Sequence, residues 1–466
     1  MRARVLVLIC VLMAAWSGLG GCAASKPVAA NRSGSDRIVV MISVDGLAGF
    51  YIDDPKAEMP TIRELAKEGA RASGMKAVVP TVTWPNHTTL VTGDYPARHG
   101  VVGNNYYDRA TGKNVVLISD PVLDKDQIVK VPTIYDLAKA SGMTTAAVRW
   151  PASRNAKTLD WTIPDVASDE LLHKYTTPGL MEECKKAGVW ADGMVPQGET
   201  DRRIVADQNS TAVFNLILKQ HHPRLALLHV TDVDHTQHLR GPRTAEAYAA
   251  VKGADGFVRQ VWEELKQDYP NRATLIVVSD HGFSPINKLI LPNVILRNAG
   301  LVNVKGIRVV AGSVHVLVQS GTAFVYILDQ ANRSQVAEKV KKAFEGVDGV
   351  QQVVMPGETT GYGLADPKVD PKAPDMFVFA KEGFSFGDTA AGALPFNEKP
   401  ERKGTHGHDP NIPDLHATFV AWGVGIQPGA ELGEIQNTDV APTIAKLLGI
   451  PMTNIDGKPL DALLEK

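Results

Sequence analysis

Seven polar residues have the side-chain types that bind a pair of divalent cations, and most of them follow an apolar run. They are Asp45, Thr83, Asp234, His238, Asp280, His281 and His406. Carboxylate and imidazole ligands together are typical of zinc sites. A single aspartate at the end of a strand is more often a helix cap or a turn residue. The full set is harder to explain that way, and it predicts a metal-dependent enzyme.

The apolar runs are the elements that must position these residues. Asp45 follows the run 38–44, Asp234 and His238 follow the run 225–230, and Asp280 with His281 follow the run 274–279. If these runs are strands of one open α/β sheet, their carboxyl ends meet at one edge, where a site assembles. The spacing of four between Asp234 and His238 would place both side chains on one helical turn.

Thr83 lies in a polar segment, 79–93, that predicts the start of a helix. We expect Pro85 to be the first helical residue, since that position needs no N–H. Thr83 then lies at the helix N-terminus, where free N–H groups and the helix dipole favour negative charge. A hydroxyl group there is suited to attack phosphorus. A capped helix without any catalytic function would have the same sequence features, so the assignment of Thr83 depends on the motifs around it.

Apolar runs alternate with helical stretches along most of the chain. This alternation predicts an α/β fold with a mostly parallel central sheet and helices on both faces. Residues 290–400 break the alternation with several short strands, which indicates a small inserted α+β subdomain. The expected divisions are a catalytic core of residues 37–289, the insertion 290–400 and a second part of the core, 401–466.

The N-terminal residues predict export rather than folded structure. Two arginines precede the apolar run 5–16, and residues 19–22 resemble a bacterial lipoprotein box that ends in Cys22. We expect residues 1–22 to be a signal peptide, Cys22 to carry a lipid, and residues 23–36 to be a flexible tether. The protein would then be periplasmic and anchored to the outer membrane. Ordinary cleavage after small residues, which would give a secreted protein, is the alternative.

Composition excludes one class of partner. The 466 residues carry a formal net charge of −2. A nucleic-acid-binding surface needs a basic excess, so we expect no such surface. A nucleotide as a small substrate remains compatible with this charge.

A series of short motifs resembles the nucleotide pyrophosphatase/phosphodiesterase family of the alkaline phosphatase superfamily. The motifs occur in matching order from about residue 37 to about residue 450. They are Val44-Asp45-Gly46, Thr83-Trp84-Pro85-Asn86-His87, Thr92-Gly93, Tyr95-Pro96, His99-Gly100, Gly103-Asn104, Asp234 with His238 and Gly241-Pro242, Ser279-Asp280-His281-Gly282, and His406-Gly407. Each motif is weak alone, but the set is specific and implies the alkaline-phosphatase-like fold.

The resemblance implies two zinc ions and a covalent mechanism. One zinc site would use Asp45, Thr83, Asp280 and His281, and the other would use Asp234, His238 and His406. Thr83 would attack phosphorus and form a phospho-threonine intermediate, which water then cleaves. Asn104 would donate a hydrogen bond to a phosphoryl oxygen. Trp84 would line a substrate pocket, although a core indole is an equally good interpretation.

The substrate expected from the sequence is a phosphodiester or a pyrophosphate, nucleotides included. Members of the superfamily that cleave monoesters or phosphonates often carry a basic pair after the strand that ends here at Val148. This chain has only Arg149 there, followed by Trp150-Pro151, which resembles the diesterase pattern. A phosphomonoesterase or phosphonate hydrolase is the alternative, and a lipoprotein that binds ligands without catalysis is a weaker one.

Overall fold

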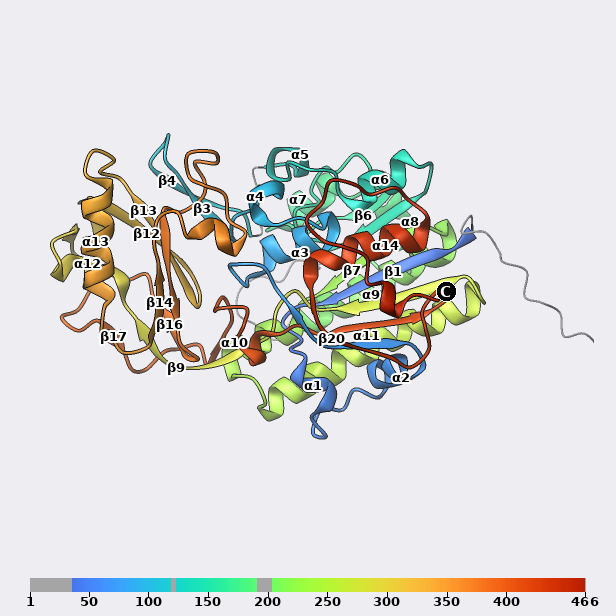
Figure 1. Cartoon of the computed structure of the whole chain (residues 1–466). Coiled ribbons are helices and arrows are strands. Elements are labelled where there is room, and N and C mark those ends of the chain that lie inside the picture. The colour runs from blue at the N-terminus through green and yellow to red at the C-terminus, as the bar shows by residue number, and fades with distance from the viewer. Residues whose placement is uncertain (1–35, 119–122, 191–202, 466) are drawn as a thin grey trace, which may run out of the picture.

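The computed structural model describes residues 36–118, 123–190 and 203–465 (Figure 1). The expected signal peptide, Cys22 and nearly all of the tether therefore lie outside the described residues. Among the residues that are described, no helix has the length and apolar character needed to cross a membrane.

An eight-stranded sheet forms the centre of the larger part of the molecule. The strand order is β20-β2-β19-β8-β1-β7-β5-β6. Strand β1 runs parallel to both of its neighbours, β7 and β8, whereas β19 runs antiparallel to β8 and β2. The prediction of a mostly parallel sheet is confirmed. The strands are β1 Ile38–Val44, β2 Ala70–Lys76, β5 Thr145–Val148, β6 Trp161–Ile163, β7 Leu225–Val230, β8 Ala273–Val278, β19 Phe419–Gly423 and β20 Ala430–Gln436.

Helices cover both faces of this sheet, as the alternation predicts (Figure 1). Successive side chains of β1 pack into apolar cores on opposite faces of the sheet, because side chains alternate across a strand. Val40, Ile42 and Val44 pack with α2 (Pro60–Glu68), α9 (Arg203–His221) and α11 (Ala245–Asp268). Val39 and Met41 pack on the other face with α3 (Thr83–Thr92), α6 (Ile134–Ala140) and α14 (Val440–Leu448). Every residue of β1, β7 and β8 is buried, which explains why their sequences are almost entirely apolar.

Shorter helices connect these layers. They are α1 Phe50–Asp53, α4 Pro96–His99, α5 Lys125–Ile128, α7 Asp169–Tyr175, α8 Leu180–Lys186 and α10 Asp232–Arg240. Helix α10 follows β7 and carries two of the predicted metal ligands. The hydroxyl group of Thr244 accepts the N–H of Ala247 and so caps the N-terminus of α11.

Smaller sheets form the other part of the molecule, on the left of Figure 1. Four antiparallel strands in the order β12-β13-β15-β14 pack with α12 and α13 around a separate apolar core. Strand β9 pairs with β16, β17 and β18, and two hairpins join β10 with β11 and β3 with β4. The predicted boundaries of the insertion, at residues 290 and 400, stay a prediction.

The elements of this part have the following bounds. The strands are β3 Asn105–Asp108, β4 Lys113–Val116, β9 Ser284–Ile290, β10 Val302–Lys305, β11 Arg308–Gly312, β12 Val314–Gln319, β13 Thr322–Ile327, β14 Val350–Val354, β15 Met376–Ala380, β16 Gly383–Phe386, β17 Phe396–Asn397 and β18 Gly404–Thr405. The helices are α12 Pro292–Asn298 and α13 Arg333–Phe344.

Candidate metal centre and active site

Three adjacent strands deliver most of the predicted metal ligands to one edge of the central sheet. Asp45 directly follows β1, and Asp280 and His281 come just after the end of β8. On the other side of β1, strand β7 leads into α10, which carries Asp234 and His238. The strands run parallel, so their carboxyl ends meet, and the side chains converge there.

Asp45, Asp280 and His281 form one group of potential ligands. Their nearest donor atoms all lie within 4.8 Å of one another. His281 Nε2 is 3.5 Å from Asp45 Oδ1 and 3.2 Å from Asp280 Oδ2. The backbone N–H of Gly46 donates to Asp280 Oδ1 at 3.2 Å. Gly46 has a φ of +69°, and a Cβ atom there would lie 3.1 Å from Asp234 Cα, so this turn requires glycine.

Asp234, His281 and His406 form a second group, with donor atoms also within 4.8 Å of one another. His238 joins it, since its Nε2 is 3.5 Å from Asp234 Oδ1 and 3.2 Å from His406 Nε2. His406 comes from the segment after β18, and its ring stacks on that of His281 at 3.7 Å. His281 therefore contacts both groups, whereas the sequence assigned it to one. That these residues bind metal stays a prediction.

The three imidazole rings share one orientation. In each ring Nδ1 lies 2.9–3.0 Å from a backbone carbonyl oxygen, which can only accept a hydrogen bond, so Nδ1 carries the hydrogen and donates. Nε2 then presents a lone pair to the centre, as in most histidine metal ligands. The acceptor is the carbonyl oxygen of Gly404 for His238, that of Gly282 for His281, and that of Thr81 for His406. Burial lowers the pKa of His238 and of His406, which keeps these two rings neutral.

Negative charge accumulates among the carboxylates of this centre. Burial first, and then the negative charges of Asp280 and Asp234, raise the pKa of Asp45 well above its ordinary value. Several buried atoms have no hydrogen-bond partner among the described residues: Asp45 Oδ1, Asp234 Oδ1, Asp280 Oδ2 and His281 Nε2. Burial of unpaired polar atoms is costly unless a cation is coordinated. This donor set fits a pair of divalent cations, and its carboxylate and imidazole chemistry fits zinc.

Thr83 is the first residue of α3, and 7% of its surface is exposed. The expectation that Pro85 begins the helix is wrong, because Pro85 is its third residue. Proline is tolerated there since the first N–H groups of a helix have no intrahelical acceptor. His87, one turn later, places Nδ1 2.9 Å from the Thr83 carbonyl oxygen and 3.5 Å from Asp280 Oδ2. The N-terminus of α3 therefore lies against the first ligand group.

Asn104 is fixed in orientation beside Thr83. Its Oδ1 accepts a hydrogen bond from the Trp84 N–H at 2.9 Å, and its own backbone N–H donates to Gln319 Oε1 at 3.2 Å. The side-chain NH₂ of Asn104 is thereby left to donate elsewhere. The indole of Trp84 packs in a buried cluster with Val101 and Leu117. This position fits the core interpretation of Trp84, and a role in a substrate pocket stays a prediction.

His229 contacts the centre although the sequence argument left it unassigned. Its Nε2 is 3.1 Å from Asp45 Oδ2, and its Nδ1 is 3.0 Å from the carbonyl oxygen of Arg149. Burial lowers the pKa of His229 to about 3. The sequence feature that could have pointed to His229 is its position as a polar residue inside the otherwise apolar run 225–230.

Two further residues hold the segments that carry predicted ligands. Asp207 Oδ2 accepts the backbone N–H groups of Thr231 and Asp232, each at 2.8 Å, and so caps α10. Asn86 Oδ1 accepts the N–H of Val78 at 2.7 Å, while its NH₂ donates to the Val82 carbonyl at 2.8 Å. Asn86 was within a quoted motif, whereas nothing in the sequence marks Asp207, which lies in the long helix α9.

Comparison with known proteins agrees with this geometry. Human ectonucleotide pyrophosphatase/phosphodiesterase family member 1 is 26% identical over 421 residues, which are 88% of this chain and 40% of that protein. Human bis(5′-adenosyl)-triphosphatase ENPP4 is 23% identical over 88% of this chain and 78% of that protein. The chain thus spans less than half the length of the first of these relatives.

Solved structures show the same fold. Murine ectonucleotide pyrophosphatase/phosphodiesterase 5, an inactive variant in complex with AMP, superimposes with a TM-score of 0.68 at 20% identity. The match covers 92% of this chain and all of that one. Residues 39–409 match the family described as type I phosphodiesterase/nucleotide pyrophosphatase. The chain therefore belongs to the type I phosphodiesterase/nucleotide pyrophosphatase family.

Proposed function

We propose that this protein is a two-zinc phosphodiesterase and nucleotide pyrophosphatase that works through a covalent threonine intermediate. The observation that carries the proposal is the convergence of unpaired carboxylate and imidazole atoms at the sheet edge, with Thr83 beginning the adjacent helix. Asp45, Thr83, Asp280 and His281 would hold one ion, and Asp234, His238 and His406 would hold the other. When bound, the two ions supply positive charge that favours an ionised Thr83 hydroxyl and stabilises the departing oxygen.

In the first step Thr83 Oγ loses its proton to solvent and forms a bond to phosphorus. The bond between phosphorus and the leaving oxygen breaks, and the leaving group departs with the electron pair. A water molecule then attacks phosphorus and loses a proton to solvent, the bond between phosphorus and Thr83 Oγ breaks, and Thr83 Oγ takes up a proton to restore the hydroxyl group. Asn104 contributes its NH₂ group to a non-bridging phosphoryl oxygen, because its Oδ1 is already occupied by the Trp84 N–H.

A diester or anhydride is the preferred substrate class. A monoester carries an extra negative charge, and Arg149 is the basic residue that follows β5 at the corresponding place. Its guanidinium is buried and lies 3.2 Å from Asp165 Oδ1. Because that charge is already compensated, it is not available for a second phosphoryl charge. The names of the relatives, nucleotide pyrophosphatase and bis(5′-adenosyl)-triphosphatase, favour nucleotides as the substrates of this chain as well.

The same proposal includes export and a lipid anchor on Cys22. The supporting feature is the basic and apolar sequence that ends in the lipoprotein-like residues 19–22. Mass spectrometry of the mature N-terminus tests this part. A diacylated cysteine supports the anchor, and an unmodified N-terminus beyond residue 22 contradicts it.

The enzymatic proposal is tested with the protein after removal and return of zinc. We expect hydrolysis of the p-nitrophenyl ester of AMP, little hydrolysis of p-nitrophenyl phosphate, loss of activity after chelation, and recovery with zinc. Thr83→Ala should abolish turnover while retaining most of the metal. Thr92→Ala is a matched control, since it removes a buried threonine hydroxyl from the other end of α3. Faster cleavage of the monoester than of the diester would instead support the phosphomonoesterase alternative.

A further inference from the structure

Strand β12 lies at one edge of the four-stranded sheet β12-β13-β15-β14, and its outer side pairs with no strand of the described residues. Its six residues, Val314–Gln319, include no proline, glycine or charged residue. Natural proteins usually protect such an edge with charges, proline or a bulge, because unpaired backbone groups attract another strand. The opposite edge strand, β14, does have a register shift, between Val350 and Gln352. Strand β12 lacks this protection.

The register of the sheet shows which backbone groups of β12 lie on the open side. The carbonyl oxygen of Gly321, just before β13, accepts the N–H of Ala380, so the odd-numbered residues of β13 bond towards β15. Its even-numbered residues therefore bond towards β12, where they pair with odd-numbered residues. The N–H and C=O groups of Val316 and Val318 consequently point to the open side. None of these four groups forms a hydrogen bond with the described residues.

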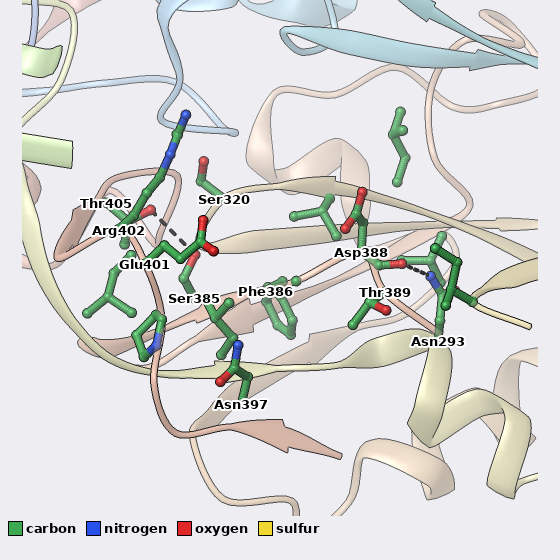
Figure 2. A pocket seen from close by; sticks show the side chains of 18 of the residues that line it. Asn293, Ser320, Ser385, Phe386, Asp388, Thr389, Asn397, Glu401, Arg402 and Thr405 are labelled. Carbon is green, nitrogen blue, oxygen red and sulfur yellow. Dashed lines mark hydrogen bonds between the residues drawn. The ribbon is translucent and has the colours of Figure 1, made fainter. Parts of the chain in front are cut away.

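A large cleft lies along this open side (Figure 2). Four successive residues of β12, 315–318, line it, and strands β9, β11, β16 and β17 contribute other walls. Its volume of about 1230 Å³ exceeds the roughly 300–1000 Å³ of most small-molecule sites.

The two ends of the open side are closed by the protein itself. Ser320 O accepts the N–H of Phe386 at 3.0 Å, and Leu301 O accepts the N–H of Ser313 at 2.9 Å. The six residues between these contacts span roughly 20 Å when extended. The open side of β12 thus has the length of a short added strand.

The two faces of β12 differ in polarity. On one face Val316 packs in an apolar core that Val309 also contacts. On the other face His315 Nε2 lies 2.8 Å from Asn114 Oδ1, and Asn105 also lines the cleft. Side chains of a strand added to this edge would alternate between the two faces. Alternating apolar and polar side chains would therefore match the site.

Cations outnumber carboxylates in the lining. Arg308, Lys399 and Arg402 are exposed, and their side chains form no ion pair with the described residues. Two carboxylates, Asp388 and Glu401, also line the cleft. Figure 2 shows Arg402 and Glu401 towards one end of the cleft and Asp388 towards the other. The excess of positive charge favours acidic side chains in whatever binds here.

We propose that the open edge of β12 binds an extended acidic peptide segment of another protein, which joins the sheet as an additional strand. Val316 and Val318 present donors and acceptors in a line along the cleft. Another extended backbone matches this pattern, whereas a compact small molecule does not. The peptide site is separate from the metal centre and does not depend on the proposed function.

The test begins with selection of binders from a displayed library of random peptides against the folded protein. The tightest binder is synthesised with a fluorescent label, and fluorescence polarisation gives its dissociation constant. We expect acidic residues to be enriched. N-methylation of the peptide backbone should weaken binding by about ten-fold or more at every second position and little at the positions between them, because only alternate N–H groups face the partner strand.

Variants of the protein test the same contacts from the other side. Val318→Pro removes one outward N–H, and proline is tolerated where the N–H of an edge strand does not pair. It should weaken binding by about ten-fold, whereas the matched control Val318→Thr, which keeps the N–H and a similar shape, should bind like the wild type. Arg308→Ala and Arg402→Ala should each weaken binding several-fold at low salt, and Arg308→Lys should restore it.

The N-methylation series uses the wild-type protein, so it decides the question even if Val318→Pro does not fold. Equal losses at successive positions, or no selected peptide that binds the wild type more tightly than folded Val318→Pro, would overturn the inference. Selection of basic peptides would contradict the assigned charge. A wild-type dimer in analytical ultracentrifugation that Val318→Pro dissociates would also overturn it, because a second copy of the chain would then cover this edge.

Discussion

Replacement of Asn104 by alanine removes one donor from the proposed phosphoryl site. The Oδ1 atom of Asn104 is held by the Trp84 N–H at 2.9 Å, and its backbone is held by Gln319. The side-chain NH₂ is therefore oriented before substrate binds, which is the condition under which a donor contributes most to catalysis. Loss of one such donor raises the barrier by about 3 kcal/mol, or roughly a hundred-fold to a thousand-fold in kcat.

The assay is steady-state hydrolysis of the p-nitrophenyl ester of AMP by zinc-loaded protein. We expect kcat and kcat/KM of Asn104→Ala to fall by similar factors, because the lost contact acts mainly in the transition state. The alanine also leaves the Trp84 N–H without its acceptor, which should lower the free energy of unfolding by about 1 kcal/mol.

Asn104→Asp separates these two effects. The carboxylate can still accept the Trp84 N–H, but it cannot donate and it repels the phosphoryl charge. We expect this variant to retain the stability of the wild type while it loses at least as much activity as the alanine variant. If Asn104→Ala kept a rate within about three-fold of the wild type, a difference of less than 1 kcal/mol in the barrier, the assigned role of Asn104 would be refuted.

Two further predictions concern stability. Asp207→Ala removes the acceptor of two backbone N–H groups at the start of α10. Urea denaturation should therefore show a free energy of unfolding lower by about 2 kcal/mol, and Asp207→Asn should lose less. Equal stability of the wild type and both variants would contradict this capping role. Burial lowers the pKa of His99 to about 3 in the folded protein, from 6.5. The unfolded chain therefore binds the extra proton below pH 6.5, and stability falls as the pH falls. Between pH 6.5 and pH 5 the wild type should lose about 2 kcal/mol more than His99→Asn, and parallel pH profiles would contradict this.

The central strands β1, β7 and β8 were predictable because each is a nearly continuous apolar run. Strand β1 is apolar at every one of its seven positions except Ser43, and both of its faces are buried, so its sequence shows no alternation. The direction of β19 was not predictable, because an apolar run has the same composition in either direction. It depends on pairing with β8 and β2, which are distant in sequence.

The candidate site was predictable where a residue follows a strand, as Asp45 and Asp280 do. It was less predictable where a side chain acts across a long sequence separation. Asp207, for example, caps α10 from another helix. The position of Pro85 within α3 shows a different limit, since proline is compatible with any residue of the first turn.

The central claim is that the metal-activated hydroxyl of Thr83 becomes bonded to phosphorus during turnover. Rapid acid quenching of zinc-loaded protein during hydrolysis of the p-nitrophenyl ester of AMP, followed by peptide mass spectrometry, measures this directly. We expect the peptide containing Thr83 to gain one adenylyl group, and the chelated protein to show no such gain. Turnover without modification of Thr83, together with full activity of Thr83→Ala, would contradict it.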